Sequence, residues 1–407
     1  MKNSRSVYST VLNRWNYSSL LFLGATFAGA TTAAFPLLLL EFGYSKPAVA
    51  IFFCINPLIA VLYNLVGMRW VARAGYPPML LVITCLCVPT GTALMTLSGG
   101  NVFILYLGSA LMVTTSTVLP QVFGRMAAAT SGDTQDLLIA ALRQLQVAGY
   151  ITGLGAFALF GTINVDPTLG AAAISILAAL IAMTVVKDAR RLPDRNTPDA
   201  SAASQIGTSA ASSPSWTSGI LIALIIVALL KSADAMRAVY LPLYTAMTGF
   251  TAADISLLLI IVAIIEFAVL PAVGRGGQRF GNYKMIALIS VLGSISFLIL
   301  MISEERPWIY ASQVFFAMFA AGFQSIGLAM LARLLPGGAG QGAAVFQAVI
   351  QLGAILGVTL PLLLPGYSSS IFAVAFLACI LAATLSALLS RSRRHAPDLQ
   401  DSDKVEQ

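Results

Sequence analysis

The chain has 407 residues, of which 58% are hydrophobic and 10% are charged. A soluble globular protein carries about 25% charged residues because its surface must face water, so most of the surface of this chain must face lipid instead. The formal net charge of +7 does not indicate a nucleic-acid partner, because Lys and Arg stand singly in short gaps between apolar runs and form no basic face or arm. Composition therefore predicts an all-α membrane protein in contact with the lipid bilayer.

Runs of mostly apolar residues predict twelve transmembrane helices, because about 20 such residues are needed to cross roughly 30 Å of hydrocarbon. In the first half of the chain the runs are 17–40, 47–68, 77–98, 101–123, 137–161 and 169–186. In the second half they are 218–246, 253–274, 283–302, 307–331, 341–364 and 369–390. The weakest of these are the fourth and the eleventh, which are rich in Thr, Gly or Gln.

The basic residues alternate with these runs in a way that predicts orientation. With the N-terminus inside, the inner segments contain eighteen Lys and Arg residues, and the outer loops contain two, Lys46 and Arg306. Cytoplasmic loops of membrane proteins carry such an excess of basic residues. We therefore expect a multi-pass protein of the bacterial inner membrane with both termini in the cytoplasm.

The segment 187–217 separates the first six runs from the last six. It begins with a charged stretch and continues with Ser, Ala, Pro and Thr and almost no large apolar residues, a composition that cannot bury enough surface to fold. Two similar halves are typical of transporters built from repeats, with a substrate site near the midplane. We expect an N-terminal six-helix bundle (1–186), a flexible cytoplasmic linker (187–217), a C-terminal six-helix bundle (218–390) and a disordered cytoplasmic tail (391–407).

Two predicted inner loops occupy corresponding places in the two halves and share a short pattern. The first contains Arg73 and Gly75, and the second contains Gly274, Arg279 and Gly281, so each loop places Arg two residues before Gly. Gly permits a sharp turn between antiparallel helices. The Arg can bind helix-end carbonyls or an acid on a neighbouring helix, in a contact that a rocking motion breaks. We therefore interpret these residues as gating loops.

These loops resemble the signature of the major facilitator superfamily, G-x-x-x-D-R-x-G-R-[RK]. The second loop keeps the three residues named above and has a base one position late at Lys284, while the first keeps its Arg and Gly. Both lack the acid of the signature, which is replaced by Ala72 and Gln278. The resemblance implies the major facilitator fold, with twelve transmembrane helices in two pseudo-symmetric six-helix halves.

Within this superfamily, the chain resembles the bacterial sugar efflux transporters through scattered short matches over most of its length. The matching positions are Asn56, Leu119 to Phe123, Arg143, Gln144, Leu241 to Tyr244, Glu266 and Leu335 to Gly340. The resemblance implies efflux of small sugars or sugar-like molecules driven by protons. The expected partners are therefore a small-molecule substrate and protons, and the chain is expected to be a monomer.

Ionisable residues inside the predicted spans point to function, because each costs about 2.5–3.5 kcal/mol at mid-helix on insertion scales. Arg143, in the fifth run, offers a rigid fork of donors to substrate oxygens, or else pairs with a helix end or an acid. Lys231, Asp234 and Arg237 share one broad face of the seventh run, so Asp234 can neutralise either base. This cluster is either a self-compensating structural group or a site where Asp234 binds substrate or a proton and the bases contact substrate.

Glu266 is the most isolated acid within the predicted spans. Burial would favour its neutral form, as a proton-coupling site requires, and the alternative is a salt bridge to a neighbouring base. Amide side chains suit a hydroxyl-rich ligand because they offer both donors and acceptors, although they also hold helices together. Among them we expect Asn56, Gln144, Gln347 and Gln351 to contribute to the substrate site, and the last two share a face of the eleventh run.

The histidine, the cysteines and the lack of catalytic motifs in the predicted spans limit the classes of function. The single histidine lies in the polar tail and the four cysteines lie within apolar runs, so we expect no metal site and no cofactor. The runs contain no phosphate-binding loop and no Ser/His or paired-Asp constellation, so a secondary transporter is favoured over an ATP-driven pump or an intramembrane enzyme.

The substrate stays open between two classes. The family resemblance favours a sugar-like metabolite, whereas the intramembrane bases favour an anionic or zwitterionic metabolite, such as a carboxylate siderophore or a drug-like natural product. A non-transporting membrane receptor or assembly factor is a further alternative.

Overall fold

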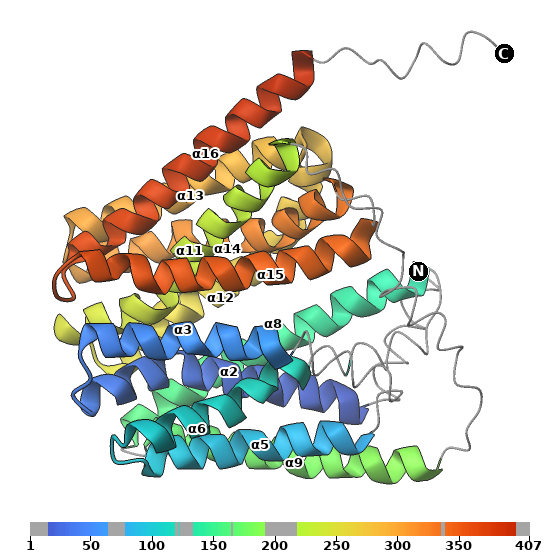
Figure 1. Cartoon of the computed structure of the whole chain (residues 1–407), viewed down its shortest axis with the longest axis vertical. Coiled ribbons are helices and arrows are strands. Elements are labelled where there is room, and N and C mark those ends of the chain that lie inside the picture. The colour runs from blue at the N-terminus through green and yellow to red at the C-terminus, as the bar shows by residue number, and fades with distance from the viewer. Residues whose placement is uncertain are drawn as a thin grey trace. The chain divides into compact units, whose positions relative to one another are not determined.

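The computed structural model (Figure 1) describes residues 15–63, 78–118, 122, 133–163, 166–191, 218–334 and 338–395. Each predicted transmembrane run falls on a helix within these ranges. Seven of the helices in the described part are long and apolar enough to cross a membrane by length and composition, and the others are shorter apolar helices. The predicted all-α membrane fold is confirmed.

The described residues fall into two compact units. Unit 1 comprises residues up to 210 together with 237–267 and 358–368, and unit 2 comprises 211–236, 268–357 and the residues from 369 onward. The helices of the first half are α2 (Trp15–Glu41), α3 (Lys46–Leu62), α5 (Pro78–Leu97), α6 (Val102–Val113), η2 (Thr114–Thr117), α8 (Asp133–Thr162) and α9 (Pro167–Arg191). Those of the second half are α11 (Ser218–Met247), α12 (Ala252–Phe280), α13 (Asn282–Ile302), α14 (Arg306–Leu334), α15 (Gly338–Thr359), η3 (Leu360–Leu363), η4 (Ser369–Ile371) and α16 (Phe372–His395).

On α9 of unit 1, large side chains face outward and small ones face inward, as expected for a helix at the lipid boundary. On α9, Leu177 and Leu180 are about half exposed, whereas Ala178, Ala179 and Ala182 are buried against α2 and α5. Lipid tails are as apolar as Leu, so membrane helices gain little by burying Leu, and small residues let their backbones pack closely. The outward leucines are therefore the lipid-facing surface.

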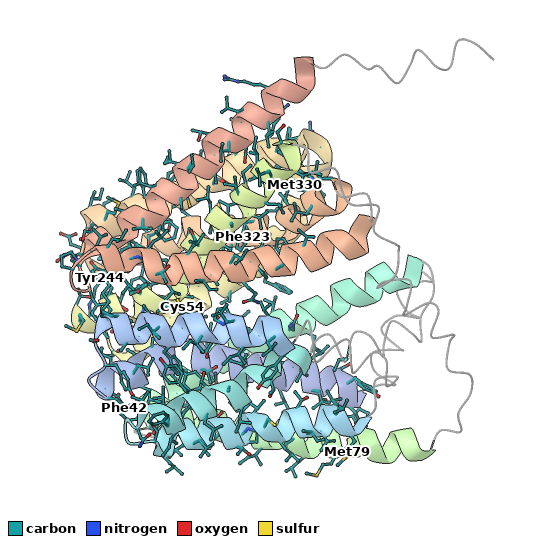
Figure 2. All side chains as sticks on the ribbon, in the orientation of Figure 1. Phe42, Cys54, Met79, Tyr244, Phe323 and Met330 are labelled. Carbon is teal, nitrogen blue, oxygen red and sulfur yellow. The ribbon has the colours of Figure 1, made fainter. Side chains whose placement is uncertain are left out.

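Unit 2 has an aromatic core between α13, α14 and α16. Phe297 of α13 packs edge-on against Phe316 of α14 and lies nearly parallel to Phe372 of α16. All three rings are fully buried. Side chains throughout the two units are drawn in Figure 2, where Phe323 of the same α14 row is labelled.

Two helices end earlier than the apolar runs predict, and local chemistry explains both ends. Helix α6 tightens into η2 because Thr114 and Thr115 donate to carbonyl oxygens three residues back, at 2.6 Å each, which competes with the regular helix. Helix α15 gives way to η3 at Pro361, which lacks a backbone N–H and blocks the next turn. At the other extreme, α16 continues through His395 into the predicted tail.

Loops predicted to lie on the same side of the membrane contact one another in unit 1. The hydroxyl of Tyr44, after α2, donates to the carbonyl of Gly100, between α5 and α6, at 2.9 Å. Thr96, at the end of α5, bonds to Thr168, at the start of α9, at 3.0 Å. These contacts fit the alternation of spans that the sequence predicts.

Candidate functional site

Helix α8 crosses α2 at very close range through two glycines one turn apart. A Cβ atom added to Gly149 would overlap the carbonyl oxygen of Phe22, and one added to Gly153 would overlap that of Thr26. On the facing side, a Cβ on Gly29 would overlap the carbonyl of Tyr150. Small residues on both helices therefore let the two backbones touch.

Helix α15 crosses α11 in the same way in unit 2. A Cβ on Gly353 would overlap the carbonyl oxygen of Ala228, and one on Gly357 would overlap that of Ser232. Adding 204 to the glycine positions 149 and 153 gives 353 and 357, and adding 206 to the carbonyl positions 22 and 26 gives 228 and 232. The second half of the chain thus repeats the α2–α8 crossing of the first half with a nearly constant offset.

The close crossing yields a testable expectation for stability. Gly153→Val should lower the free energy of unfolding by about 1–3 kcal/mol or more, since overpacking of a tight contact costs that much. Gly155→Val on the same helix is the matched control, because a Cβ there meets nothing within 4 Å. Thermal unfolding of the detergent-purified variants measures the difference, and equal midpoints for the two would contradict the crossing.

A cavity of about 310 Å³ lies in unit 1 between α2, η2 and α8. Its lining residues are Leu20, Leu21, Gly24, Ala25, Ala28, Thr115, Val118 and Gln146. The wall is mostly apolar, but the side-chain oxygen of Gln146 is buried and has no hydrogen-bond partner among the described residues. A buried acceptor without a partner is costly, so a solute that donates a hydrogen bond there would be favoured.

Helix α2 is exposed at one point in its middle, and that point is in the cavity. From Asn16 to Leu40, Ala28 is the single exposed position, while the neighbours Phe27 and Gly29 are buried. Ala25 and Thr32, on the same face, are half-buried. Because Ala28 is the most exposed position in the middle of the helix, this stripe is the part of α2 most open to the cavity.

The charged cluster of α11 contains an ion pair. The ammonium of Lys231 donates to the Oδ2 atom of Asp234 at 2.6 Å, and 25% and 17% of the two side chains are exposed. Asp234 thus neutralises Lys231, one of the two bases that its helical position allowed. Arg237, one turn further on, is only 6% exposed.

The repeat relates the Lys231–Asp234 ion pair to residues of α2 that line the cavity. Applying the offset of 206 to Ala25 and Ala28 gives Lys231 and Asp234, and the next member of the stripe, at 32, gives Ala238. Positions 231, 234 and 238 are likewise half-buried, in a stretch of α11 whose intervening residues are buried. The pair therefore occupies the helix face that corresponds to the cavity wall on α2.

The other residues predicted for the substrate site are more dispersed. Asn56 on α3 accepts a hydrogen bond from the hydroxyl of Ser109 on α6, which shows that this amide at least bridges two helices. Glu266 on α12 and Gln351 on α15 are half-buried. The side chains of Arg143, Gln144 and Gln347 lie outside the described residues.

Of the predicted gating loops, the second is described. Gly274 and Arg279 belong to the last turns of α12, and Gly281 forms the junction with α13. Gly281 has a φ of +86°, a backbone conformation that Gly adopts readily and that permits the sharp turn expected there. The guanidinium of Arg279 lies 5.4 Å from the ring centre of Phe280. Arg73 and Gly75 lie outside the described residues.

Two features of the structure were not singled out by the sequence. Gln146 was one of many amides within the spans, and only the cavity distinguishes it from the others. Lys46 was counted as one of the two bases in the outer loops, but its ammonium contacts Tyr240, Leu364 and Tyr367. Both depend on contacts between helices far apart in the chain, which no local pattern signals.

Residues 232–406 match the family described as the Major Facilitator Superfamily. Among solved structures, the chain is similar to the nucleoside transporter NupG, with a TM-score of 0.69 and 13% identity over 94% of this chain and 99% of that one. It is also similar to a mutant of the peptide transporter POT in complex with alafosfalin, with a TM-score of 0.73 and 14% identity over 96% of this chain and 98% of that one. A third similar structure is a bacterial homologue of the iron transporter ferroportin in an inward-facing state. Its TM-score is 0.69, and its sequence is 15% identical over 92% of this chain and 98% of that one.

No curated protein sequence matches the chain. Identities of this size establish the fold alone, and they do so over nearly the whole length of each protein. The chain therefore has the fold of these membrane transport proteins, the major facilitator fold.

Proposed function

We propose that this chain is a secondary transporter that moves a small polar metabolite out of the cell in exchange for protons. The observation that carries the proposal is the Lys231–Asp234 ion pair within the 30-residue helix α11, at positions that correspond to a cavity wall on α2. Charged groups inside membrane helices are costly and mark substrate and proton paths. Export, and a sugar or sugar-like substrate, are supported by the resemblance to the sugar efflux transporters.

We assign the coupled proton to Asp234. While its carboxylate is ionised, it holds the ammonium of Lys231 at 2.6 Å. Protonation would remove the negative charge, and with it the charged acceptor that the ion pair offers to a hydroxyl or amine of a solute, so proton and solute would compete for the same carboxylate, as exchange in opposite directions requires. The two protonation states thus present different surfaces to the same solute, and such a difference in interaction is what coupling between two ligands requires.

The solved structures support a small solute as cargo without naming it. Their titles describe transporters of nucleosides, peptides and iron, so proteins of this fold carry chemically different substrates. The test is flux through the full-length protein in proteoliposomes, with a panel of neutral sugars, amino acids and small carboxylates, under an imposed pH gradient.

We expect at least one member of the panel to cross, and the pH gradient to accelerate it. Flux at the same rate with and without the gradient would contradict proton coupling. Binding of a panel member without flux of any would favour the non-transporting receptor.

An anionic or zwitterionic substrate is the second candidate, and the bases of α11 favour it. Lys231→Gln and Arg237→Gln should each raise the KM for an anionic substrate by about 10- to 100-fold, since a hydrogen bond to a charged group contributes about 1.5–3 kcal/mol. A neutral sugar should be affected less. The KM values of both variants for a carboxylate and for a sugar, measured side by side, distinguish the two classes, and normal transport of the carboxylate by both variants would exclude the second.

A further inference from the structure

Lys46, the first residue of α3, is held by groups from the second half of the sequence. Its Nζ atom donates to the carbonyl oxygen of Leu364 at 2.8 Å. The same atom lies 5.6 Å from the ring centre of Tyr240 and 5.8 Å from that of Tyr367. A cation within about 6 Å of an aromatic ring is attracted by the negative face of the ring, so three groups converge on one ammonium.

The three groups are fixed by contacts of their own. Tyr240 is fully buried, and its hydroxyl donates to the carbonyl of Val358 at 2.7 Å. Its ring lies 6.3 Å from that of Tyr367. Gly366 has a φ of +63°, a conformation that favours Gly, and it shapes the turn that brings Leu364 and Tyr367 together. The receptor for the ammonium is thus largely preorganised.

The chemistry of this receptor selects a primary ammonium group. The usual partner of Lys is a carboxylate, yet within the described ranges Lys46 makes no salt bridge. Two aromatic rings attract any cation, while the carbonyl oxygen requires a donor N–H and so adds a preference for an ammonium that still carries hydrogens. All of these residues belong to unit 1.

We propose that Tyr240, Tyr367 and the carbonyl of Leu364 form a binding site for a primary ammonium group, and that Lys46 is its resident ligand. Occupancy of the site by Lys46 holds α3 against the segment 358–368. When Lys46 leaves, the two segments separate and the site is open to a primary amine from solution. This assignment concerns the end of α3 and is independent of the charges on α11.

The reactivity of Cys54 reports on this contact. Cys54 lies two turns beyond Lys46 on α3, about 80° around the helix axis from it, and is half-buried (labelled in Figure 2). Cys85 and Cys379 are buried and serve as internal controls for folding. In the purified full-length protein in detergent, Lys46→Ala should raise the labelling rate of Cys54 by a soluble maleimide about tenfold, the scale expected for the loss of a cation–π contact and a charge-assisted hydrogen bond.

The specific prediction is chemical rescue. Millimolar ethylammonium should slow the labelling of Cys54 in Lys46→Ala back toward the wild-type rate. Tetramethylammonium, which has no N–H to donate to Leu364, should be less effective, and ethanol should have no effect. Rates for Cys54, Cys85 and Cys379 come from the same digest by peptide-resolved mass spectrometry.

A second set of variants changes the aromatic part of the ammonium site and leaves Lys46 unchanged. Tyr367→Leu should raise the labelling rate, whereas Tyr367→Phe should not, because it keeps the ring and removes a hydroxyl that makes no hydrogen bond with the described residues. Wild-type labelling in both Lys46→Ala and Tyr367→Leu would overturn the proposal. So would faster labelling of Lys46→Ala that ethylammonium leaves unchanged, since the site would then not recognise an ammonium group.

Discussion

Replacement of Asp234 by Asn should separate coupling from binding. Asn keeps the size of the side chain and resembles the protonated acid, so the variant should be held in the state that has released Lys231. We expect proton-driven transport to fall by at least about tenfold, the consequence of losing 1.4 kcal/mol or more of coupling free energy. Exchange of labelled for unlabelled substrate across the membrane needs no net proton movement and should continue, because the amide oxygen of Asn still accepts hydrogen bonds from the substrate.

The two assays together identify the role of Asp234. Loss of both activities would assign Asp234 to substrate binding or to structure, and retention of both would exclude it as the proton site. Glu266→Gln is the matched comparison, because Glu266 is the other half-buried acid that the sequence marked. If Glu266→Gln alone loses driven transport and keeps exchange, the proton belongs to Glu266 and our assignment to Asp234 is wrong.

If Asp234→Asn loses transport, structural damage is the main alternative explanation. Removing both partners of the ion pair together is the control for such damage. Removing one partner leaves the other charge without its counter-ion, while removing both leaves none. Because both side chains are partly exposed, the cost of one unpaired charge is smaller than in a dry core. The double variant Lys231→Met, Asp234→Asn should therefore unfold at a higher temperature than Lys231→Met, yet show no proton-driven transport.

The helices were predictable because lipid imposes a strong and local constraint. A span needs a long apolar run wherever it lies in the bundle, so hydropathy and the spacing of bases located every helix that the structure describes. What apolar runs do not reveal is which face is inside. On α5, Leu81 and Cys85 are buried, whereas Ile83 and Leu86 are exposed, and all four are apolar. In a soluble helix the polar residues would have marked the outer face.

The candidate site was partly predictable from the sequence. Contacts between residues close together in the chain could be predicted, and contacts between distant helices could not. The pairing of Lys231 with Asp234 follows from their i, i+3 spacing on one helix. The cavity residue Gln146 and the Lys46 contacts do not, because they depend on helices separated by more than a hundred residues. The repeat is intermediate between these cases. The glycine pairs at 149 and 153 and at 353 and 357 are visible in the sequence, but the carbonyls that they face are visible only in the structure.

Filling the cavity of unit 1 should block transport without unfolding the protein. Ala28 is the one exposed position in the middle of α2 and lines the cavity of about 310 Å³. Ala28→Phe would place a ring in that space. We expect transport to fall at least about tenfold, since a well-packed obstruction costs the bound solute 1.4 kcal/mol or more. The thermal midpoint should change little, because the ring enters existing space.

The control for this experiment is the same substitution on a different surface. Ala148 on α8 is exposed and lies about 160° around the helix axis from Gln146, so Ala148→Phe adds an equal ring away from the cavity and should leave transport intact. Gln146→Leu then tests the polar contact itself. If the buried oxygen accepts a hydrogen bond from the substrate, the variant should raise KM about 5- to 100-fold, the equivalent of 1–3 kcal/mol. Wild-type transport by Ala28→Phe would place the solute path elsewhere and remove the link between this cavity and the corresponding face of α11.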